Sequence, residues 1–201
     1  MLVTFEGIDG AGKTTLMKQV SALLKSNGNF GVFEFREPGG TILGEEIRKL
    51  LKTYSMQPST AFLLFSAARK ENTELVKSFI SISNEIDEQT IFLFDRYVDS
   101  SYAYQCVYGV PLHLIAAVSE EVALKPDLSF FLDIDVETAI QRLKAQGDKE
   151  DNQNVEFLSA VDSIYRERMK LEANRWFVLD ATLPLEELAH IVVAEINRRH
   201  I

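Results

Sequence analysis

The length, composition and charge of the chain exclude several classes of protein. Its 201 residues, 46% apolar and 25% charged, suit one globular α/β domain that buries about 70% of the surface of its unfolded chain. The formal charge of −9 argues against binding to duplex nucleic acid, since such proteins carry basic stripes. An anionic substrate would therefore have to be attracted by a local basic cluster.

The cysteine content and the apolar runs bear on where the protein works. Cys106 is the only cysteine in the sequence, so an intrachain disulfide is impossible and a reducing compartment is expected. The apolar run of residues 1–5 is too short for a secretory signal, and no segment approaches the roughly 18 apolar residues of a membrane helix. We therefore expect a cytoplasmic protein that does not enter a membrane.

Apolar runs and helical periods alternate along the chain. The pattern predicts strands at residues 2–5, 31–36, 91–94, 128–132 and 176–179. It predicts helices at 13–26 and 41–53, a long helical region at 58–82 and two helical segments between 96 and 128. Further helices are predicted at 136–145, from after 153 to about 172, and at 185–199. Short apolar strands separated by helices indicate an α/β fold: a five-stranded parallel sheet with helices on both faces and the site at the carboxyl ends of the strands.

A glycine-rich loop follows the first strand directly. Residues 7–14, Gly-Ile-Asp-Gly-Ala-Gly-Lys-Thr, match G-x-x-x-x-G-K-[ST] between a strand and a helix, the context of a P-loop. Its backbone N–H groups would cradle phosphates, Lys13 would reach the β- and γ-phosphates, and the Thr14 hydroxyl would ligate Mg²⁺. A glycine turn with a coincidental lysine is the alternative, which the flanking elements disfavour. The predicted ATP-binding residues are Gly7, Ile8, Asp9, Gly10, Ala11, Gly12, Lys13, Thr14 and Thr15.

The third strand ends in an acid. Asp95 follows the apolar run 91–94, at the place where P-loop enzymes hold their metal through water. Alone, an aspartate at this place is equally expected to cap a loop. Beside the P-loop, it forms with Thr14 the predicted metal pair.

Four segments together resemble one family, thymidylate kinase (dTMP kinase). They are Phe-Glu-Gly-Ile-Asp-Gly-Ala-Gly-Lys-Thr-Thr at 5–15, Arg-Glu-Pro-Gly-Gly-Thr at 36–41, Leu-Leu-Phe-Ser-Ala-Ala-Arg at 63–69, and Asp-Arg-Tyr-Val-Asp-Ser-Ser-Tyr-Ala-Tyr-Gln at 95–105. Apart from the P-loop each segment is weak alone, but the combination is specific. The resemblance implies a single P-loop kinase domain over residues 1–201, which phosphorylates dTMP to dTDP with ATP and Mg²⁺ and forms a homodimer.

The resemblance also implies roles for residues around the base and sugar. Phe65 would stack on thymine, the alternative being a core phenylalanine on an apolar helix face. Arg69 would hydrogen-bond the base, helped by Ser101 and Gln105 on its other edge. Asp9 would lie near the 3′-hydroxyl, and Tyr104 would pack against the 2′ position and exclude ribose.

The resemblance assigns the acceptor phosphate to arginines. Arg96 would clamp this phosphate with its planar fork, and Arg36 would share it. The alternative for Arg96 is a structural ion pair with a neighbouring acid. Pro38 would form a cis-proline turn.

Two segments depart from the family pattern. A lid loop near 146–153 lacks arginine, and the P-loop carries Asp9 rather than an arginine. Lys149 is the only basic residue of this loop, so we expect Arg142 on the preceding helix to supply the main positive charge to ATP, with Lys149 secondary. The alternative for Arg142 is a solvated surface charge. Residues 106–111 replace a stretch that is rich in glycine and arginine in the family.

The implied reaction is in-line attack by a dTMP phosphate oxygen on the γ-phosphorus of ATP. Such transfer depends on positioning and charge neutralisation, with Lys13, Arg96, Arg142 and Lys149 as the expected catalytic cations. Alternatives are a kinase for another nucleoside monophosphate or a deoxynucleoside, and a catalytically weak P-loop nucleotide-binding protein. A guanine-nucleotide switch is disfavoured because the sequence has no Asn-Lys-x-Asp.

Overall fold

A computed structural model describes residues 1–28, 30–86, 89–145 and 154–200. Its sheet has five parallel strands, in the order β2-β3-β1-β4-β5. The strands are β1 (Leu2–Glu6), β2 (Gly31–Arg36), β3 (Thr90–Asp95), β4 (Leu128–Asp133) and β5 (Trp176–Asp180). The predicted fold class and all five predicted strands are confirmed, with ends that differ by one residue at most.

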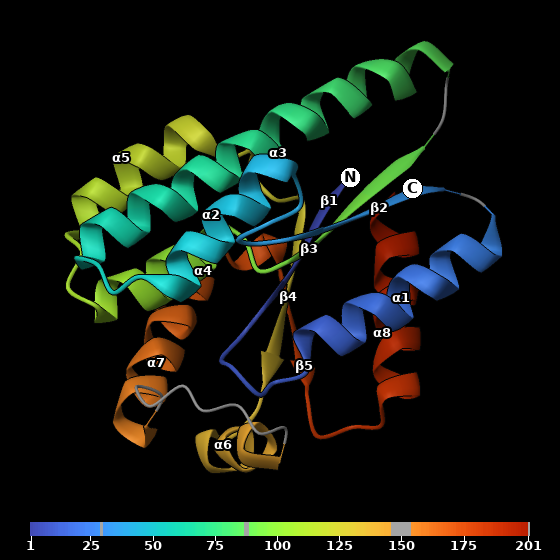
Figure 1. Ribbon diagram of the computed structural model, residues 1–201. Helices are drawn as coiled ribbons and strands as arrows, with labels where there is room; N and C mark the ends of the chain where they lie inside the picture. Colours follow the sequence, from blue (N-terminus) through green and yellow to red (C-terminus); the bar gives the residue numbers. More distant parts are fainter. Residues whose placement is uncertain (29, 87–88, 146–153, 201) are drawn as a thin grey trace.

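Helices cover both faces of this sheet (Figure 1). Helices α1 and α8 lie side by side on one face, and α3 crosses the other face with α2 and α5 packed beside it (Figure 1). The helices are α1 (Lys13–Asn27), α2 (Ile42–Thr53), α3 (Pro58–Ile86), α4 (Val98–Ser100), α5 (Leu112–Val122), α6 (Val136–Ala145), α7 (Val155–Leu171) and α8 (Leu185–His200). A π-helical turn, Ser101–Gln105, follows α4, and a 3₁₀ turn, Ala173–Arg175, precedes β5. In the described residues, no helix is both long and apolar enough to span a bilayer.

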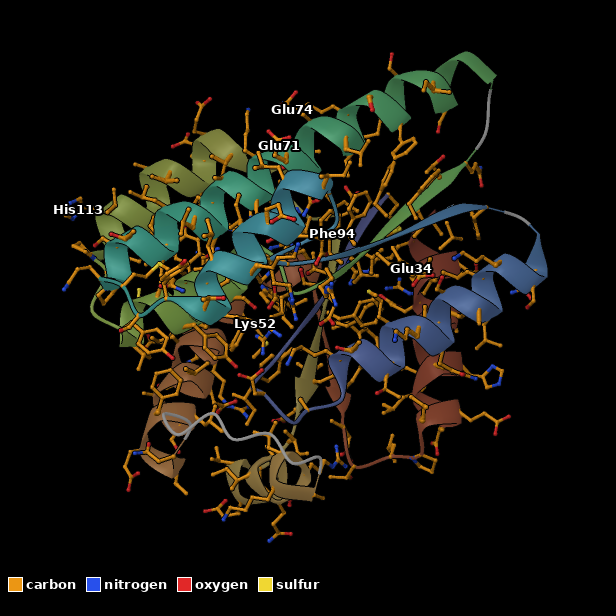
Figure 2. All side chains as sticks on the ribbon, in the orientation of Figure 1. Glu34, Lys52, Glu71, Glu74, Phe94 and His113 are labelled. Carbon is orange, nitrogen blue, oxygen red and sulfur yellow. The ribbon has the colours of Figure 1, made fainter. Side chains whose placement is uncertain are left out.

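The three central strands, β1, β3 and β4, are largely apolar because both of their faces are buried, whereas the edge strands β2 and β5 are partly exposed. Along β3, Leu93 packs with the α1 side of the core, whereas Phe94 packs with Phe35 and Val76 on the α3 side. Phe94 lies between the sheet and the helices in Figure 2, whereas Glu71, Glu74 and His113 point outward from α3 and α5.

The strand order places β1 directly against β3, with Phe5 opposite Asp95. The carboxyl ends of the two strands therefore meet at one edge of the sheet. This neighbourhood brings the glycine-rich loop after β1 beside the Asp95–Gln105 segment after β3, although about 85 residues separate them in the sequence. The candidate site lies at this edge, as the strand pattern predicts.

Candidate functional site

The loop between β1 and α1 has the backbone that a phosphate cradle needs. Gly10 and Gly12 have φ of +83° and +96°, a region that side chains rarely adopt. A Cβ on Gly10 would lie 2.3 Å from the carbonyl oxygen of Ala139, a backbone atom of α6 that cannot move aside. Thr14 and Thr15 lie in the first turn of α1, where the partial positive charge of a helix N-terminus is concentrated. The predicted loop is therefore formed in the structure.

Lys13 is held inside this loop. Its ammonium donates to the Ile8 carbonyl at 2.7 Å, and the residue is only 6% exposed. Burial, together with the nearby positive charge of Arg96, lowers the pKa of Lys13 to about 8. A cation kept with so little solvation is placed to receive an anionic ligand.

The two predicted metal ligands lie together. The Thr14 hydroxyl donates to a carboxylate oxygen of Asp95, across the junction of α1 and β3. A hydroxyl and a carboxylate are hard oxygen donors, and Mg²⁺ usually takes one or two such protein groups and completes its shell with water and substrate phosphates. This donor pair fits Mg²⁺ beside a bound nucleotide. Among the described residues, no cluster of three or more His, Cys, Asp or Glu could hold a metal elsewhere.

A cavity of about 530 Å³ opens next to the P-loop. Its size is typical of sites for small ligands, which run from about 300 to 1,000 Å³. Its wall contains almost all of the residues predicted to bind the acceptor, namely Asp9, Phe65, Arg69, Arg96, Ser101, Tyr104 and Gln105. The structure thus assembles in one cavity a set that the sequence spreads over 97 positions.

Arg96 has an unusual backbone and several partners. Its φ is +66°, the only positive φ of a non-glycine residue in the described ranges. Its backbone N–H donates to the Phe5 carbonyl at 3.1 Å. The guanidinium pairs with Asp9, donates to the hydroxyl of Tyr104 at 3.1 Å, and lies 4.7 Å from the centre of the Tyr104 ring. Both hypotheses for Arg96 are therefore compatible with the geometry, because the ion pair with Asp9 stands on the cavity wall.

Glu6 is a site residue that the sequence reasoning missed. Its buried carboxylate accepts from the Tyr97 N–H at 2.8 Å, from the Ser100 hydroxyl at 2.6 Å and from the Tyr165 hydroxyl at 2.8 Å. Burial and the negative charge of Asp99 raise the pKa of Glu6. This carboxylate ties the end of β1 to the loop that carries Arg96. The sequence carried one sign of this role, since Glu6 is a charged residue at the end of a largely apolar strand.

The inner end of the cavity is polar and buried. Arg69 is 2% exposed and donates from Nε to Glu37 Oε2 at 2.7 Å, from Nη1 to Ser101 Oγ at 2.9 Å and from Nη2 to the Tyr97 carbonyl at 3.1 Å. Burial raises the pKa of Glu37 to about 7, although Arg69 acts in the opposite direction. Gln105 Oε1 is buried and has no hydrogen-bond partner within the described part of the chain.

Phe65 lies on the cavity wall and is partly exposed. It is Phe62, one turn earlier on α3, that fills the core beside Val110 and Ile115. The alternative that Phe65 is a core residue is therefore wrong. The Glu37–Pro38 peptide bond is cis, as the resemblance implies.

Two of the predicted cations, Arg36 and Arg142, do not line this cavity. Arg36 instead pairs with both oxygens of Glu45 at 2.9 and 3.0 Å on the exposed side of the β2–α2 loop. Arg142 donates to the carbonyl of Ala181 at 3.1 Å. Lys149 and the predicted lid loop, 146–153, lie outside the described residues.

Two other cations, Arg48 and Lys52, were missed and do line the cavity. They come from α2, and Arg48 also donates to the Pro38 carbonyl at 3.0 Å. Their spacing of four residues places both on one face of the helix, so helical periodicity could have found them. With Arg69 and Arg96 they form the local basic cluster that the acidic chain was expected to need.

A parallel sheet that carries a phosphate-binding loop beside a basic cavity is typical of P-loop kinases that act on small phosphorylated acceptors. Comparison with known proteins narrows this class. The thymidylate kinase family model matches residues 5–192. The probable thymidylate kinase of Methanoculleus marisnigri is 36% identical, over 98% of this chain and 94% of the relative. The thymidylate kinases of Lactobacillus acidophilus and Thermomicrobium roseum are 34% and 38% identical, over 98% and 97% of this chain and 94% and 93% of the relatives. The chain belongs to the thymidylate kinase family.

Proposed function

We propose that this chain transfers the γ-phosphoryl group of ATP to dTMP and so forms dTDP and ADP. Family membership supports the reaction. The choice of base rests on one observation: the same buried wall presents N–H donors of Arg69 and the Gln105 Oε1 acceptor, which has no partner among the described residues. Thymine presents a carbonyl acceptor next to an N–H donor, whereas cytosine presents an amino donor next to an acceptor at the same positions. A site built for one pattern leaves buried groups unpaired with the other.

The remaining wall residues suit a deoxynucleotide. We assign Phe65 to stacking on the base, which needs only an aromatic face. Tyr104 would pack against the 2′ carbon, where a ribose hydroxyl would collide with the ring, and Asp9 would lie near the 3′-hydroxyl. Arg96 would hold the acceptor phosphate, since its fork can grip two oxygens at once. Arg36 would have to leave Glu45 to share that phosphate.

On the donor side, residues 7–15 would bind the ATP phosphates, and Lys13 would neutralise charge on the transferring group. Thr14 and Asp95 would hold Mg²⁺, which would supply further neutralisation of phosphate charge. The acceptor phosphate is largely ionised at neutral pH, so no strong general base is required. Arg142 and Lys149 are proposed as the cations that close over ATP.

Two further properties are proposed for the protein as a whole. A homodimer is supported by an exposed apolar face on α2 and α3, which includes Ile42, Leu43, Leu50 and Leu63. A cytoplasmic location is supported by the single free Cys106 and by the need for ATP.

A coupled ADP-release assay over all common nucleoside and deoxynucleoside monophosphates tests the function. We expect dTMP to give the highest kcat/KM, with dCMP and AMP lower by at least a hundredfold. If dTMP is no better than dCMP or AMP, the assignment to thymidylate is wrong and another acceptor of the same class is indicated. If no acceptor gives turnover while ATP binds tightly, the chain is a nucleotide-binding protein and the proposal fails.

A further inference from the structure

Glu37 is a buried carboxylate on the wall of the acceptor cavity that has no assigned role. It follows β2 directly, and its N–H donates to the Asp95 carbonyl at 3.1 Å, which fixes its backbone against the end of β3. Its side chain is 3% exposed. Burying a carboxylate is costly unless it is paired, so its partner should explain its position.

That partner is Arg69. Glu37 Oε2 lies 2.7 Å from both Nε and Nη2 of Arg69. Two neutral groups, Ser101 Oγ at 2.9 Å from Nη1 and the Tyr97 carbonyl at 3.1 Å from Nη2, complete the surroundings of the guanidinium. Glu37 is the only one of the three acceptors that can carry a charge, and a hydrogen bond between two charged groups is about twice as strong as one between neutral groups. Glu37 is therefore the main restraint on the plane of the guanidinium.

This restraint determines what Arg69 can offer to a ligand. A guanidinium has five N–H donors in a rigid plane, and the described contacts leave a second N–H on Nη1. If the plane turned, this donor would no longer point in a fixed direction. The other oxygen of the carboxylate, Glu37 Oε1, is buried without a hydrogen-bond partner among the described residues, and the neutral side chain of Asn72 lies close enough to act against the rise in the pKa of Glu37.

We infer that Glu37 is a positioning residue for the acceptor base: it holds Arg69 in the orientation in which Arg69 meets the carbonyl of thymine. The inference rests on the proposed function and deepens it, since it places the origin of base selectivity partly in a residue that acts through another. Glu37 supports selectivity because a freely turning Arg69 could also adapt to a base with an amino group at the same position.

The test compares Glu37→Gln with Glu34→Gln. The first variant keeps the size of the side chain and removes its charge. Glu34, on the strand that leads to Glu37, is the matched control: it is bonded to Ser21 and Lys25 of α1 and lies apart from Lys52 of the cavity wall (Figure 2). For Glu37→Gln we expect KM for dTMP to rise about tenfold, KM for ATP to stay within about twofold, and the ratio of kcat/KM for dTMP over dCMP to fall about tenfold. Glu34→Gln should match the parent in all three.

A double-mutant cycle with Arg69→Gln separates positioning from direct contact. If Glu37 acts through Arg69, adding Glu37→Gln to Arg69→Gln should change the dTMP/dCMP ratio by less than about twofold. A further tenfold fall would overturn the inference. If Glu37→Gln does not fold, Glu37→Asp replaces it, because the shorter chain keeps the charge but withdraws it from Arg69; an unchanged ratio in that variant also overturns the inference.

The outcomes distinguish the two proposals. A parent protein that prefers dTMP, with Glu37→Gln indistinguishable from Glu34→Gln, refutes the positioning role alone. A parent protein without preference for dTMP refutes the proposed base and the positioning role together.

Discussion

At the scale of single residues, the lowered pKa of Lys13 leads to a measurable prediction about ATP binding. The free protein holds its ammonium in a buried loop, so its pKa is lowered to about 8. ATP brings negative charge next to this group, which favours the protonated form and raises the pKa again. Since a base whose pKa rises on binding takes up protons between the two values, binding should consume protons in alkaline solution.

We expect ATP binding to take up about half a proton at pH 8, nearly one at pH 9 and almost none at pH 6.5, because the free pKa is about 8. Calorimetric titrations in buffers with different ionisation enthalpies measure this uptake. In Lys13→Arg the uptake should vanish, since arginine is charged throughout this range. Equal uptake in parent and variant would show that another group takes up the proton.

Arg142 and Lys149 compete for the same role at the donor site. Lys149 is flanked in sequence by Asp148, Glu150 and Asp151. We expect these acids to draw its ammonium away from phosphate, and lysine lacks the arginine fork. Arg142 makes one described hydrogen bond, to Ala181, which leaves N–H donors for ATP. Arg142→Ala should therefore lower kcat, at saturating ATP and dTMP, clearly more than Lys149→Ala does.

Lys144→Ala, an exposed position on the same helix, is the control and should leave kcat within about twofold. A larger loss from Lys149→Ala than from Arg142→Ala would reverse the assignment.

At the scale of elements, the segment after β3 shows what sequence patterns can and cannot predict. The strands and the P-loop follow from local signals, namely apolar runs and a fixed glycine spacing. The π-helical turn Ser101–Gln105 has no such signal, because its geometry depends on what packs around it. The pairings of Glu37 with Arg69 and of Arg36 with Glu45 likewise join residues that only the fold brings together. The residue types of the site were therefore predictable, but most of their partners were not.

A buried ion network fixes this segment to α7 and to the 3₁₀ turn before β5. Asp99, which is fully buried, accepts from Arg175 at 2.8 Å and from Arg168 at 3.2 Å. Asp99→Asn would remove the buried carboxylate that both arginines share and leave them, among the described residues, only the part-buried Glu172, so we expect the free energy of unfolding to fall by about 3 kcal/mol. Urea denaturation monitored by circular dichroism measures this.

Asp162→Asn serves as the comparison, because it breaks the pair of Asp162 with the half-exposed Arg166 at 2.7 Å and should cost less than about 1 kcal/mol. Equal losses in the two variants would mean that the Asp99 network contributes no more than a surface pair.

At the scale of the whole molecule, charge and apolar surface are unevenly distributed. The chain has a formal charge of −9, yet the cavity wall carries Arg48, Lys52, Arg69 and Arg96. Asp9 and Glu37 on the same wall offset part of this charge, but the cations outnumber them where an anionic acceptor would enter. Six of the exposed large apolar side chains lie on α2 and α3, which pack against each other on the outside of the fold (Figure 1). Since α2 also supplies Arg48 and Lys52, a partner molecule on its outer face would lie close to the acceptor cavity.

The proposed homodimer can be tested at Ile42, which is 89% exposed in the first turn of α2. Ile42→Asp should not harm the helix, because a negative charge at a helix N-terminus is favourable. It would, however, place a charge in an apolar contact between two copies. We expect light scattering after size exclusion to give twice the chain mass for the parent and the single chain mass for Ile42→Asp. Leu171→Gln, at another exposed leucine on α7, should keep the parent mass. A parent of single chain mass at micromolar concentration would refute the dimer. If Ile42→Asp is still dimeric, the contact between the two copies does not include the N-terminus of α2.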